Sequence, residues 1–294
     1  YSIFIAVSAF CNAGFDVFGF LGEYSSLCTF ASNPAVLLPV AALIIFGGLG
    51  FIVWYDIIMF RKSRHLILHT KVVLFTTLAL IVLGTVFISI FEWNNPKTMA
   101  DMDFGAKLSN SFFQSVTSRT AGFNSVDING MTSMSKMLMI LLMFIGAAPG
   151  STGGGIKVTS FIVIIMTVFS VLRNRNETIV GKRRVPRFTV YKALTVTTVA
   201  LFAIMFATLI IYFTNDLADN KDILGINALF ESVSAFSTVG LSTGVTGVSN
   251  EISRLVLALT MFLGRVGPIS LALSITANTS GKNKNQIIPE GKII

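Results

Sequence analysis

Val233-Ser-Ala-Phe-Ser-Thr-Val-Gly-Leu-Ser242 is the stretch of sequence that decides the fold. It has two counterparts nearer the N-terminus, Val7-Ser-Ala-Phe-Cys-Asn-Ala-Gly-Phe15 and the one-residue-shorter Val116-Thr-Ser-Arg-Thr-Ala-Gly-Phe123. The shared glycines Gly14, Gly122 and Gly240 are spaced by 108 and 118 residues. A near-constant long period of this kind indicates an internally repeated architecture. Each copy ends a short helical run at a glycine, the residue that most easily leaves helical geometry.

The centre of the third copy, Thr238-Val239-Gly240, is a tripeptide also found in potassium-channel filters, where backbone carbonyls replace the water shell of the ion. A single match is weak, because three small residues often occur in a row. Repetition of the whole motif makes it specific. We therefore predict that three triplets contact a cation through their carbonyls, namely Asn12, Ala13, Gly14, Thr120, Ala121, Gly122, Thr238, Val239 and Gly240.

The composition is that of an integral membrane protein. Apolar residues make up 53% of the chain and charged residues only 12%, whereas a soluble chain is about one quarter charged. The net charge of +8 does not indicate nucleic acid binding, because basic residues of membrane proteins gather in their cytoplasmic loops. The two cysteines, Cys11 and Cys28, do not make a disulfide framework.

Apolar runs of two lengths alternate along the chain. The run 104–118 would be about 22 Å long as a helix and cannot span a hydrocarbon core of about 30 Å. Residues 1–15 and 223–236 are similarly short, so we expect three re-entrant helices whose backbone is shielded by protein or by a water-filled cavity. Four runs are long enough to cross the membrane, namely 35–60, 66–91, 190–213 and 252–277.

Residues 134–172 are too long for one crossing, and a glycine-rich loop divides them. Four glycines and one proline in 149–155 cannot form a stable helix interior. We predict a broken helix with a polar loop lying across a permeation path at membrane depth. A loop that only kinks the helix is one alternative. A phosphate-binding loop is another, and it fails its pattern because Ile156 intervenes before Lys157.

The charged loops agree with one topology. Residues 61–65 and 173–192 are strongly basic and are predicted to be cytoplasmic, whereas 92–107 and 215–222 lack this excess and are predicted to lie outside. All three glycine copies then open to the outside. Arg265 lies within the last crossing and is expected to face the pore or the glycine-rich loop, because an arginine there is costly unless it has a partner. For Arg119 we expect a structural tie on the external side.

The pattern is helix, re-entrant turn, helix, repeated. We divide the chain into a partial unit 1–60, two full units 61–172 and 173–277, and a cytoplasmic tail 278–294. The fold class is an all-α integral membrane protein with fourfold pseudo-symmetry around one ion pore. Since three copies are visible and the chain begins at Tyr1 inside the first, a further copy and one helix are expected upstream.

Five motifs together resemble those of the bacterial Trk/Ktr potassium uptake family, in the family's order and over essentially the whole chain. They are the three glycine copies, Gly146-Ala-Ala-Pro-Gly-Ser-Thr-Gly-Gly-Gly-Ile-Lys157 and Gly264-Arg265-Val266-Gly267-Pro268. The resemblance is closest to the family's ion-translocating membrane subunits. It implies multi-pass insertion in the bacterial plasma membrane and potassium-selective translocation, with Na⁺ as a candidate activator and no resident cofactor.

The resemblance also implies a gate and partners. The glycine-rich loop would be an intramembrane gate beneath the filter, and Arg265 would help to hold it closed. The implied partners are a second copy in a homodimer and a cytoplasmic ring of KtrA-type nucleotide-binding regulatory subunits, docked on the basic loops and the tail. The gate residues are Gly150, Ser151, Thr152, Gly153, Gly154, Gly155, Lys157 and Arg265.

Two other classes of function were weighed against an ion path. A secondary transporter of another solute can also contain repeats and a broken helix, but it does not need three glycine-centred turns. A membrane enzyme needs clustered acids, histidines or a nucleophile. Asp56, near a cytoplasmic end, is taken as the only acid in the helices, so we expect no enzyme.

Overall fold

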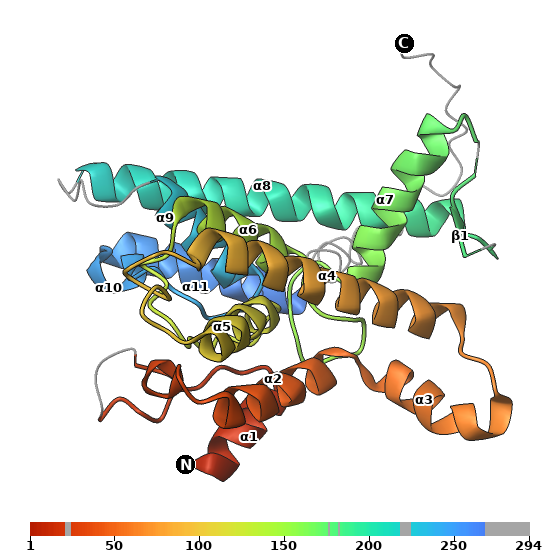
Figure 1. Cartoon of the computed structure of the whole chain (residues 1–294). Coiled ribbons are helices and arrows are strands. Elements are labelled where there is room, and N and C mark those ends of the chain that lie inside the picture. The colour runs from red at the N-terminus through yellow and green to blue at the C-terminus, as the bar shows by residue number, and fades with distance from the viewer. Residues whose placement is uncertain (21–24, 176, 182, 218–224, 268–294) are drawn as a thin grey trace.

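The structure is a computed structural model that describes residues 1–20, 25–175, 177–181, 183–217 and 225–267 (Figure 1). Its regular secondary structure within these ranges is almost entirely helical. The second half of the crossing predicted for 252–277, together with the tail 278–294, lies outside the described residues.

The elements follow the repeated order expected from the sequence. The first part of the chain contains α1 (Ser2–Phe10), η1 (Cys28–Phe30), α2 (Pro34–Gly48) and α3 (Phe51–Ser63). The middle part contains α4 (Leu68–Glu92), α5 (Phe104–Thr117), α6 (Ser133–Phe144) and α7 (Val158–Leu172). A small hairpin of β1 (Ile179–Val180) and β2 (Arg183–Arg184) precedes α8 (Arg187–Leu217), α9 (Gly225–Phe236), α10 (Val245–Val248) and α11 (Glu251–Val266).

The three short helices α1, α5 and α9 lie among the longer ones. α5 packs on α4 and α2, α9 packs on α8, α11 and α6, and α1 packs on α2. The predicted break of 134–172 is confirmed, since α6 ends at Phe144 and α7 begins at Val158. α5 and α9 therefore have their backbone covered by neighbouring helices, which is the condition for helical segments that stop inside a membrane. The described contacts of α1 are mainly with α2, and its residues Ile3, Phe4 and Val7 are exposed.

Residues 35–60, which the sequence predicts to be long enough to cross the membrane, form two helices separated by a bend. α2 and α3 are bent by 94° at a short break, and Gly50 in the break has a φ of +84°. Residues with a side chain rarely adopt this conformation, so the glycines of Gly47-Gly48-Leu49-Gly50 end one helix and start another. Hydropathy did not reveal the break, because the apolar run continues through it.

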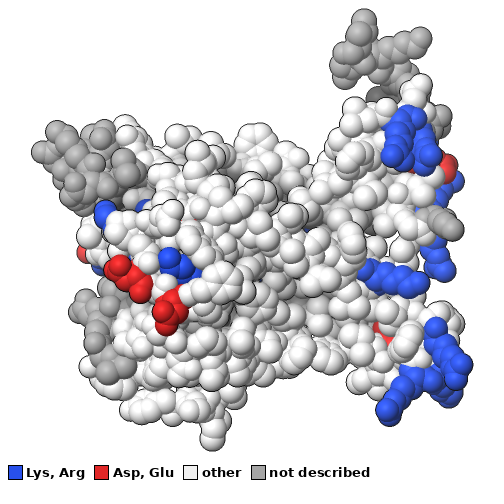
Figure 2. Space-filling view, viewed as in Figure 1, with Lys and Arg blue, Asp and Glu red and all other residues white. Residues whose placement is uncertain are grey.

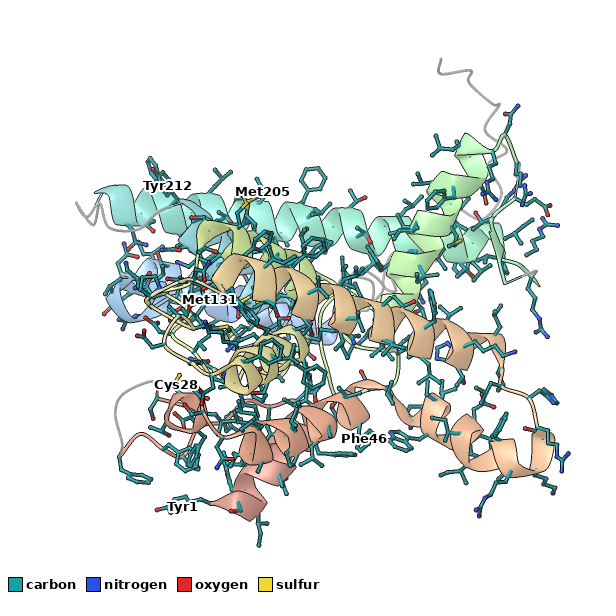
Figure 3. The ribbon with its side chains drawn as sticks, in the orientation of Figure 1. Tyr1, Cys28, Phe46, Met131, Met205 and Tyr212 are labelled. Atoms are coloured by element: carbon teal, nitrogen blue, oxygen red, sulfur yellow. The ribbon has the colours of Figure 1, made fainter. Side chains whose placement is uncertain are left out.

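The outer surface is apolar along the long helices. α4 and α8 have the length and hydropathy of membrane-crossing helices, and the bent pair α2–α3 qualifies as a third if it is taken as one span. Large apolar side chains on them are well exposed, such as Phe75, Phe202 and Phe206, and Met205 and Tyr212 project from the outer side of α8 (Figure 3). Such a surface requires lipid around it.

Charges separate along the direction of the long helices. Most of the Lys and Arg visible in Figure 2 gather at the end that holds α3, α7 and β1, while several Asp and Glu lie at the opposite end. This is the distribution that the positive-inside rule predicts for the two sides of a membrane. It places the C-terminal end of α3 and the β1–β2 hairpin on the cytoplasmic side.

Close helix packing depends on small residues at the contacts. Gly84 of α4 faces Ser115 of α5 and Leu142 of α6, and a Cβ on Gly84 would overlap the Ser115 hydroxyl. Ser115 Oγ in turn donates to Ile81 O at 2.9 Å. Small residues of this kind let helices approach in the absence of a strong hydrophobic drive between them.

We expect Gly84→Val to destabilise the protein by about 1–3 kcal/mol, because the added side chain overpacks the contact between α4 and α5. The measurement is the thermal unfolding midpoint of the purified protein in detergent. Gly105→Ala is the matched control, since no atom lies within 4 Å of a Cβ placed there. An unfolding midpoint for Gly84→Val equal to that of Gly105→Ala would contradict the packing described here.

Candidate ion-binding turns and the loop beneath them

The three predicted triplets adopt the same backbone conformation. The first and third residues of each have a positive φ: 50° and 66° at Asn12 and Gly14, 73° and 86° at Thr120 and Gly122, and 52° and 90° at Thr238 and Gly240. The middle residue of each triplet does not. Non-glycine residues with positive φ are uncommon and cluster at functional sites, so three identical instances are evidence of a shared role.

The carbonyl groups of these turns are free. None of the nine carbonyls of the triplets accepts a hydrogen bond from any described residue. The N–H groups, in contrast, bond back to the ends of the short helices: Ala13 N to Ser8 O, Ala121 N to Thr117 O and Val239 N to Ser234 O, at 2.9 to 3.0 Å. Backbone carbonyls in folded proteins are nearly always paired with protein or water. The unpaired carbonyls of the three turns are therefore available to bind another partner.

One hydroxyl residue at the end of each short helix braces the turn that follows. Thr117 Oγ1 donates to Phe123 O at 2.8 Å, and Ser234 Oγ donates to Leu241 O at 2.6 Å. In the first copy Ser8 Oγ accepts from Phe15 N at 2.9 Å. The sequence prediction missed this role, although the repeated hydroxyl at this position was visible in the motifs.

The turns face one another. A Cβ on Gly14 would overlap Ala121 O, and a Cβ on Gly122 would overlap Val239 O. The first turn therefore touches the second, and the second touches the third. A cavity of about 1200 Å³ is lined by residues of all three turns, among them Gly14, Gly122 and Gly240.

The short helices direct the negative ends of their dipoles toward these turns, since each turn follows a helix C-terminus. The carbonyls and the dipoles together favour a cation. No group of three His, Cys, Asp or Glu that could hold a metal occurs in the described ranges. A cation at the turns would therefore be held by carbonyl oxygens.

The glycine-rich loop runs directly against the turns, one residue for each. Thr152 Oγ1 lies 3.4 Å from Phe10 O at the end of α1. A Cβ on Gly153 would overlap Thr120 Oγ1, and a Cβ on Gly154 would overlap Thr238 Oγ1. These two glycines are required by the close approach, and the loop occupies the space beneath all three turns.

Two cations hold the loop from the other side. Arg265 Nη1 donates to Thr152 O at 2.8 Å, and Lys157 Nζ donates to Gly153 O at 2.7 Å. Both side chains line a second cavity of about 520 Å³ between α7, α8 and α11. Of the two orientations predicted for Arg265, the structure shows the one toward the loop.

The loop is also joined to the break between α2 and α3. Ala148 N donates to Gly48 O and Phe51 N donates to Gly150 O, both at 3.1 Å. Thr152 Oγ1 makes a further contact of 3.3 Å with Gly47 O. These contacts explain the bend at Gly50: the backbone of the broken helix pairs with the loop instead of with itself.

The predicted external tie at Arg119 is wrong in its location. Arg119 is buried at the inner end of α5, where its guanidinium lies 3.5 Å from Thr77 Oγ1 and 3.4 Å from Gly146 O. It therefore joins the second turn to α4 and to the start of the loop. The expectation failed because Arg119 lies where the re-entrant segment reverses direction. This point is the deepest part of the segment and not its external end.

The sequence prediction also overlooked Glu231, a buried acid on α9. Since Glu231 lies within the short helix α9, the expectation that Asp56 is the only acid in the helices is wrong. Its carboxylate accepts hydrogen bonds from Ser242 Oγ, from Thr243 N at 3.0 Å and from Thr246 Oγ1 at 3.0 Å. The signal available in the sequence was an acidic residue within a short apolar helix, three residues before the repeated hydroxyl residue Ser234.

Comparison with known proteins agrees with these features. The family model TrkH, described as a cation transport protein, matches residues 1–286. The chain is 39% identical to Ktr system potassium uptake protein B of Vibrio alginolyticus, over 92% of this chain and 58% of that protein. It is 36% identical to Ktr system potassium uptake protein B of Bacillus subtilis (strain 168), over 99% of this chain and 62% of that protein.

A solved structure shares the fold. The crystal structure of the potassium transporter TrkH from Vibrio parahaemolyticus matches with a TM-score of 0.71 and 17% sequence identity, covering 93% of this chain and 57% of that one. The chain thus spans about three fifths of the length of the relatives it matches. By its sequence match over nearly its whole length, the chain belongs to the TrkH family of cation transport proteins.

Proposed function

We propose that this chain forms part of a potassium-selective path across the bacterial plasma membrane. The observation that carries the proposal is the set of nine carbonyls that accept no hydrogen bond from the described residues, in three turns of which each touches the next. Relatives at 36–39% identity are named potassium uptake proteins, which supports K⁺ as the ion. Uptake of another solute by secondary transport is the weaker reading, since no contact in the turns favours it.

The chemistry of the turns favours a monovalent ion. Neutral carbonyl oxygens can replace the water shell of K⁺, whereas Mg²⁺ and Ca²⁺ sites are usually built with carboxylates. The three turns would supply three sides of a filter. A fourth side, with fourfold pseudo-symmetry, belongs to the proposal, as does the division into units 1–60, 61–172 and 173–277.

We further propose that residues 150–157 gate the path. The loop lies under all three turns, and its three fastenings are of different kinds: two cation–carbonyl bonds, backbone bonds to the α2–α3 break, and glycine contacts with the turns. Glycines at Gly153 and Gly154 let it move with little change in side-chain packing. The inner cavity beneath it provides space for the displacement.

Partners are proposed on the cytoplasmic end. Basic residues of the α3 end (Arg61, Lys62, Arg64) and the described basic residues of the 173–192 segment are exposed. Figure 2 shows most of the visible Lys and Arg at the end that holds α3, α7 and β1. They are suited to a KtrA-type nucleotide-binding ring, which the name Ktr system supports in general terms. A homodimer and activation by Na⁺ complete the proposal, and no resident cofactor is needed.

Cells that lack other potassium uptake and express the complete gene encoding this chain should accumulate Rb⁺ at low external K⁺. Unlabelled K⁺ should compete, and organic cations should not, because the carbonyl turns fit a bare ion. Cells with an empty vector are the control. No Rb⁺ uptake above that control, with the protein present in the membrane and a regulatory partner co-expressed, would overturn the proposed substrate.

Serine at the filter glycines should weaken ion binding. Gly122→Ser and Gly240→Ser place a side chain at positive φ, which costs about 1–2 kcal/mol and so about tenfold in the apparent KM for Rb⁺. The effect should be larger at Gly122, where the Cβ overlaps Val239 O, than at Gly240, where the nearest atom is 3.9 Å away. Rb⁺ uptake with Na⁺ as competitor measures both. Unchanged affinity and Na⁺ discrimination in both variants would contradict the filter.

Loosening the loop should raise the flux. Arg265→Gln removes the bond to Thr152 O and should favour the open loop by about tenfold, and deletion of 151–154 should act in the same direction. The readout is the maximal rate of Rb⁺ uptake per amount of protein in the membrane. Lys71→Gln is the control, because Lys71 is an exposed cation of α4 outside both the loop and the basic segments proposed for docking. Rates equal to wild type in both loop variants would mean that the loop is not a gate.

A further inference from the structure

The exit of the third turn is fastened to its own helix at two levels. Ser234 of α9 donates to Leu241 O, directly after Gly240. One turn earlier on α9, Glu231 reaches the next residues: Oε1 accepts from Ser242 Oγ and Thr243 N, and Oε2 accepts from Thr246 Oγ1. The Glu231 residue is 4% exposed. Because both oxygens are used by segment 242–246, the carboxylate acts as a clamp on the chain that leaves the filter.

The described contacts of the third turn come mainly from its own helix and exit segment. Gly14 meets Ala121 O, and Gly122 meets Val239 O, whereas the nearest described atom to a Cβ on Gly240 is Gly122 Cα at 3.9 Å. Among the described residues, the bonds from Ser234 and Glu231 are therefore the contacts that fix the exit of the third turn.

The corresponding positions of the other copies differ in chemistry. Glu231 lies three residues before the bracing Ser234, and Gln114 lies three residues before Thr117. Gln114 Nε2 makes one contact, 3.3 Å to Ser125 Oγ, and its Oε1 has no partner among the described residues. The first copy has Ile5 at this position. There the exit is held by Asp16, which accepts from Phe18 N at 2.7 Å and Ser26 N at 2.9 Å.

We propose that Glu231 is a positioning residue. It fixes the position of the Gly240 carbonyl in the third turn and thereby the discrimination between K⁺ and Na⁺. This inference rests on the proposed ion path. The clamp bonds fix where Leu241 and Ser242 leave the turn, and so fix the carbonyl of Gly240 from its C-terminal side. Hydrogen bonds to a carboxylate are among the strongest neutral-donor contacts in proteins, which suits a position that must not drift while ions pass.

The donor set predicts a graded effect of substitutions at Glu231. Thr243 contributes a backbone N–H, which can only donate. In Glu231→Gln, the amide oxygen still accepts from Thr243 N and Ser242 Oγ, and the NH₂ donates to the Thr246 hydroxyl, which then acts as the acceptor, so the charge of the clamp is lost while its bonds are kept. Glu231→Ala removes all three bonds. The two variants should thus give a graded loosening of the turn, while the fold of α9 is retained.

The test compares Rb⁺ uptake and its inhibition by Na⁺ in cells carrying the complete gene, at matched amounts of protein in the membrane. For Glu231→Ala we expect the apparent KM for Rb⁺ to rise, and the discrimination against Na⁺ to fall, by about tenfold, because charge-assisted bonds are lost. Glu231→Gln should show a smaller change in the same direction, as should Thr246→Val, which removes one donor.

Glu92 provides the matched control, because it is a second buried carboxylate with a similar number of bonds. It lies at the outer end of α4 and accepts from Asn95 Nδ2, Thr98 Oγ1 and Thr132 N. Glu92→Gln should lower the amount of protein without changing the KM for Rb⁺ or the Na⁺ discrimination. Equal changes in discrimination for Glu92→Gln and Glu231→Gln would overturn a specific role of Glu231.

The outcomes separate this inference from the proposed function. If wild type takes up no Rb⁺ in competition with K⁺, the ion path itself fails. If wild type transports and Glu231→Ala keeps its Rb⁺ affinity and Na⁺ discrimination, the clamp is overturned while the path stands. Should Glu231→Ala not reach the membrane, Glu231→Gln and Thr246→Val decide by the same readout, and unchanged discrimination in both overturns the clamp.

Discussion

The arrangement of the helices depends on the backbone carbonyls of the three turns, which accept no hydrogen bond from the described residues. An unpaired backbone group away from water costs several kcal/mol, so the chain keeps these groups only where a cation or water can reach them. The three short helices follow from this requirement. Each stops where the carbonyls must turn away from helical bonding, and each directs its negative dipole end toward the same place. The longer helices around them cover the rest of the backbone.

The close contacts around the turns explain where glycine is needed. Gly14 and Gly122 touch carbonyls of the neighbouring turn, and Gly153 and Gly154 touch hydroxyls of the turns from below. Each contact leaves no space for a Cβ, so the turns and the loop fit each other at the level of the backbone. Arg265 and Lys157 bind carbonyls of the same loop, so the loop is held on its other side as well.

Much of this arrangement could be predicted from the sequence, for physical reasons. The alternation of long and short apolar runs predicted α4, α8 and the re-entrant α5, because the thickness of the hydrocarbon core sets those lengths. The break between α6 and α7 could also be predicted, because residues 134–172 are too long for one crossing and the glycine-rich loop divides them. The bend after α2 could not be predicted in this way, since its cause is pairing with residues 148–150, a hundred residues away. Arg119 was misplaced for a similar reason: its partners Thr77 and Gly146 come from other segments.

The three turns are alike in backbone and different in support. The shared φ pattern and the hydroxyl at the end of each short helix come from the repeated sequence. The other side chains that hold the turn exits differ: they are Asp16 in the first copy, Gln114 in the second and Glu231 in the third. The copies also have unequal neighbours, because the α2–α3 break touches the first copy and α11 touches the third, while the loop touches all three. The equal backbone geometry of the three turns therefore does not depend on one common set of contacts, and the buried Glu231 carboxylate is the contact found behind the third turn.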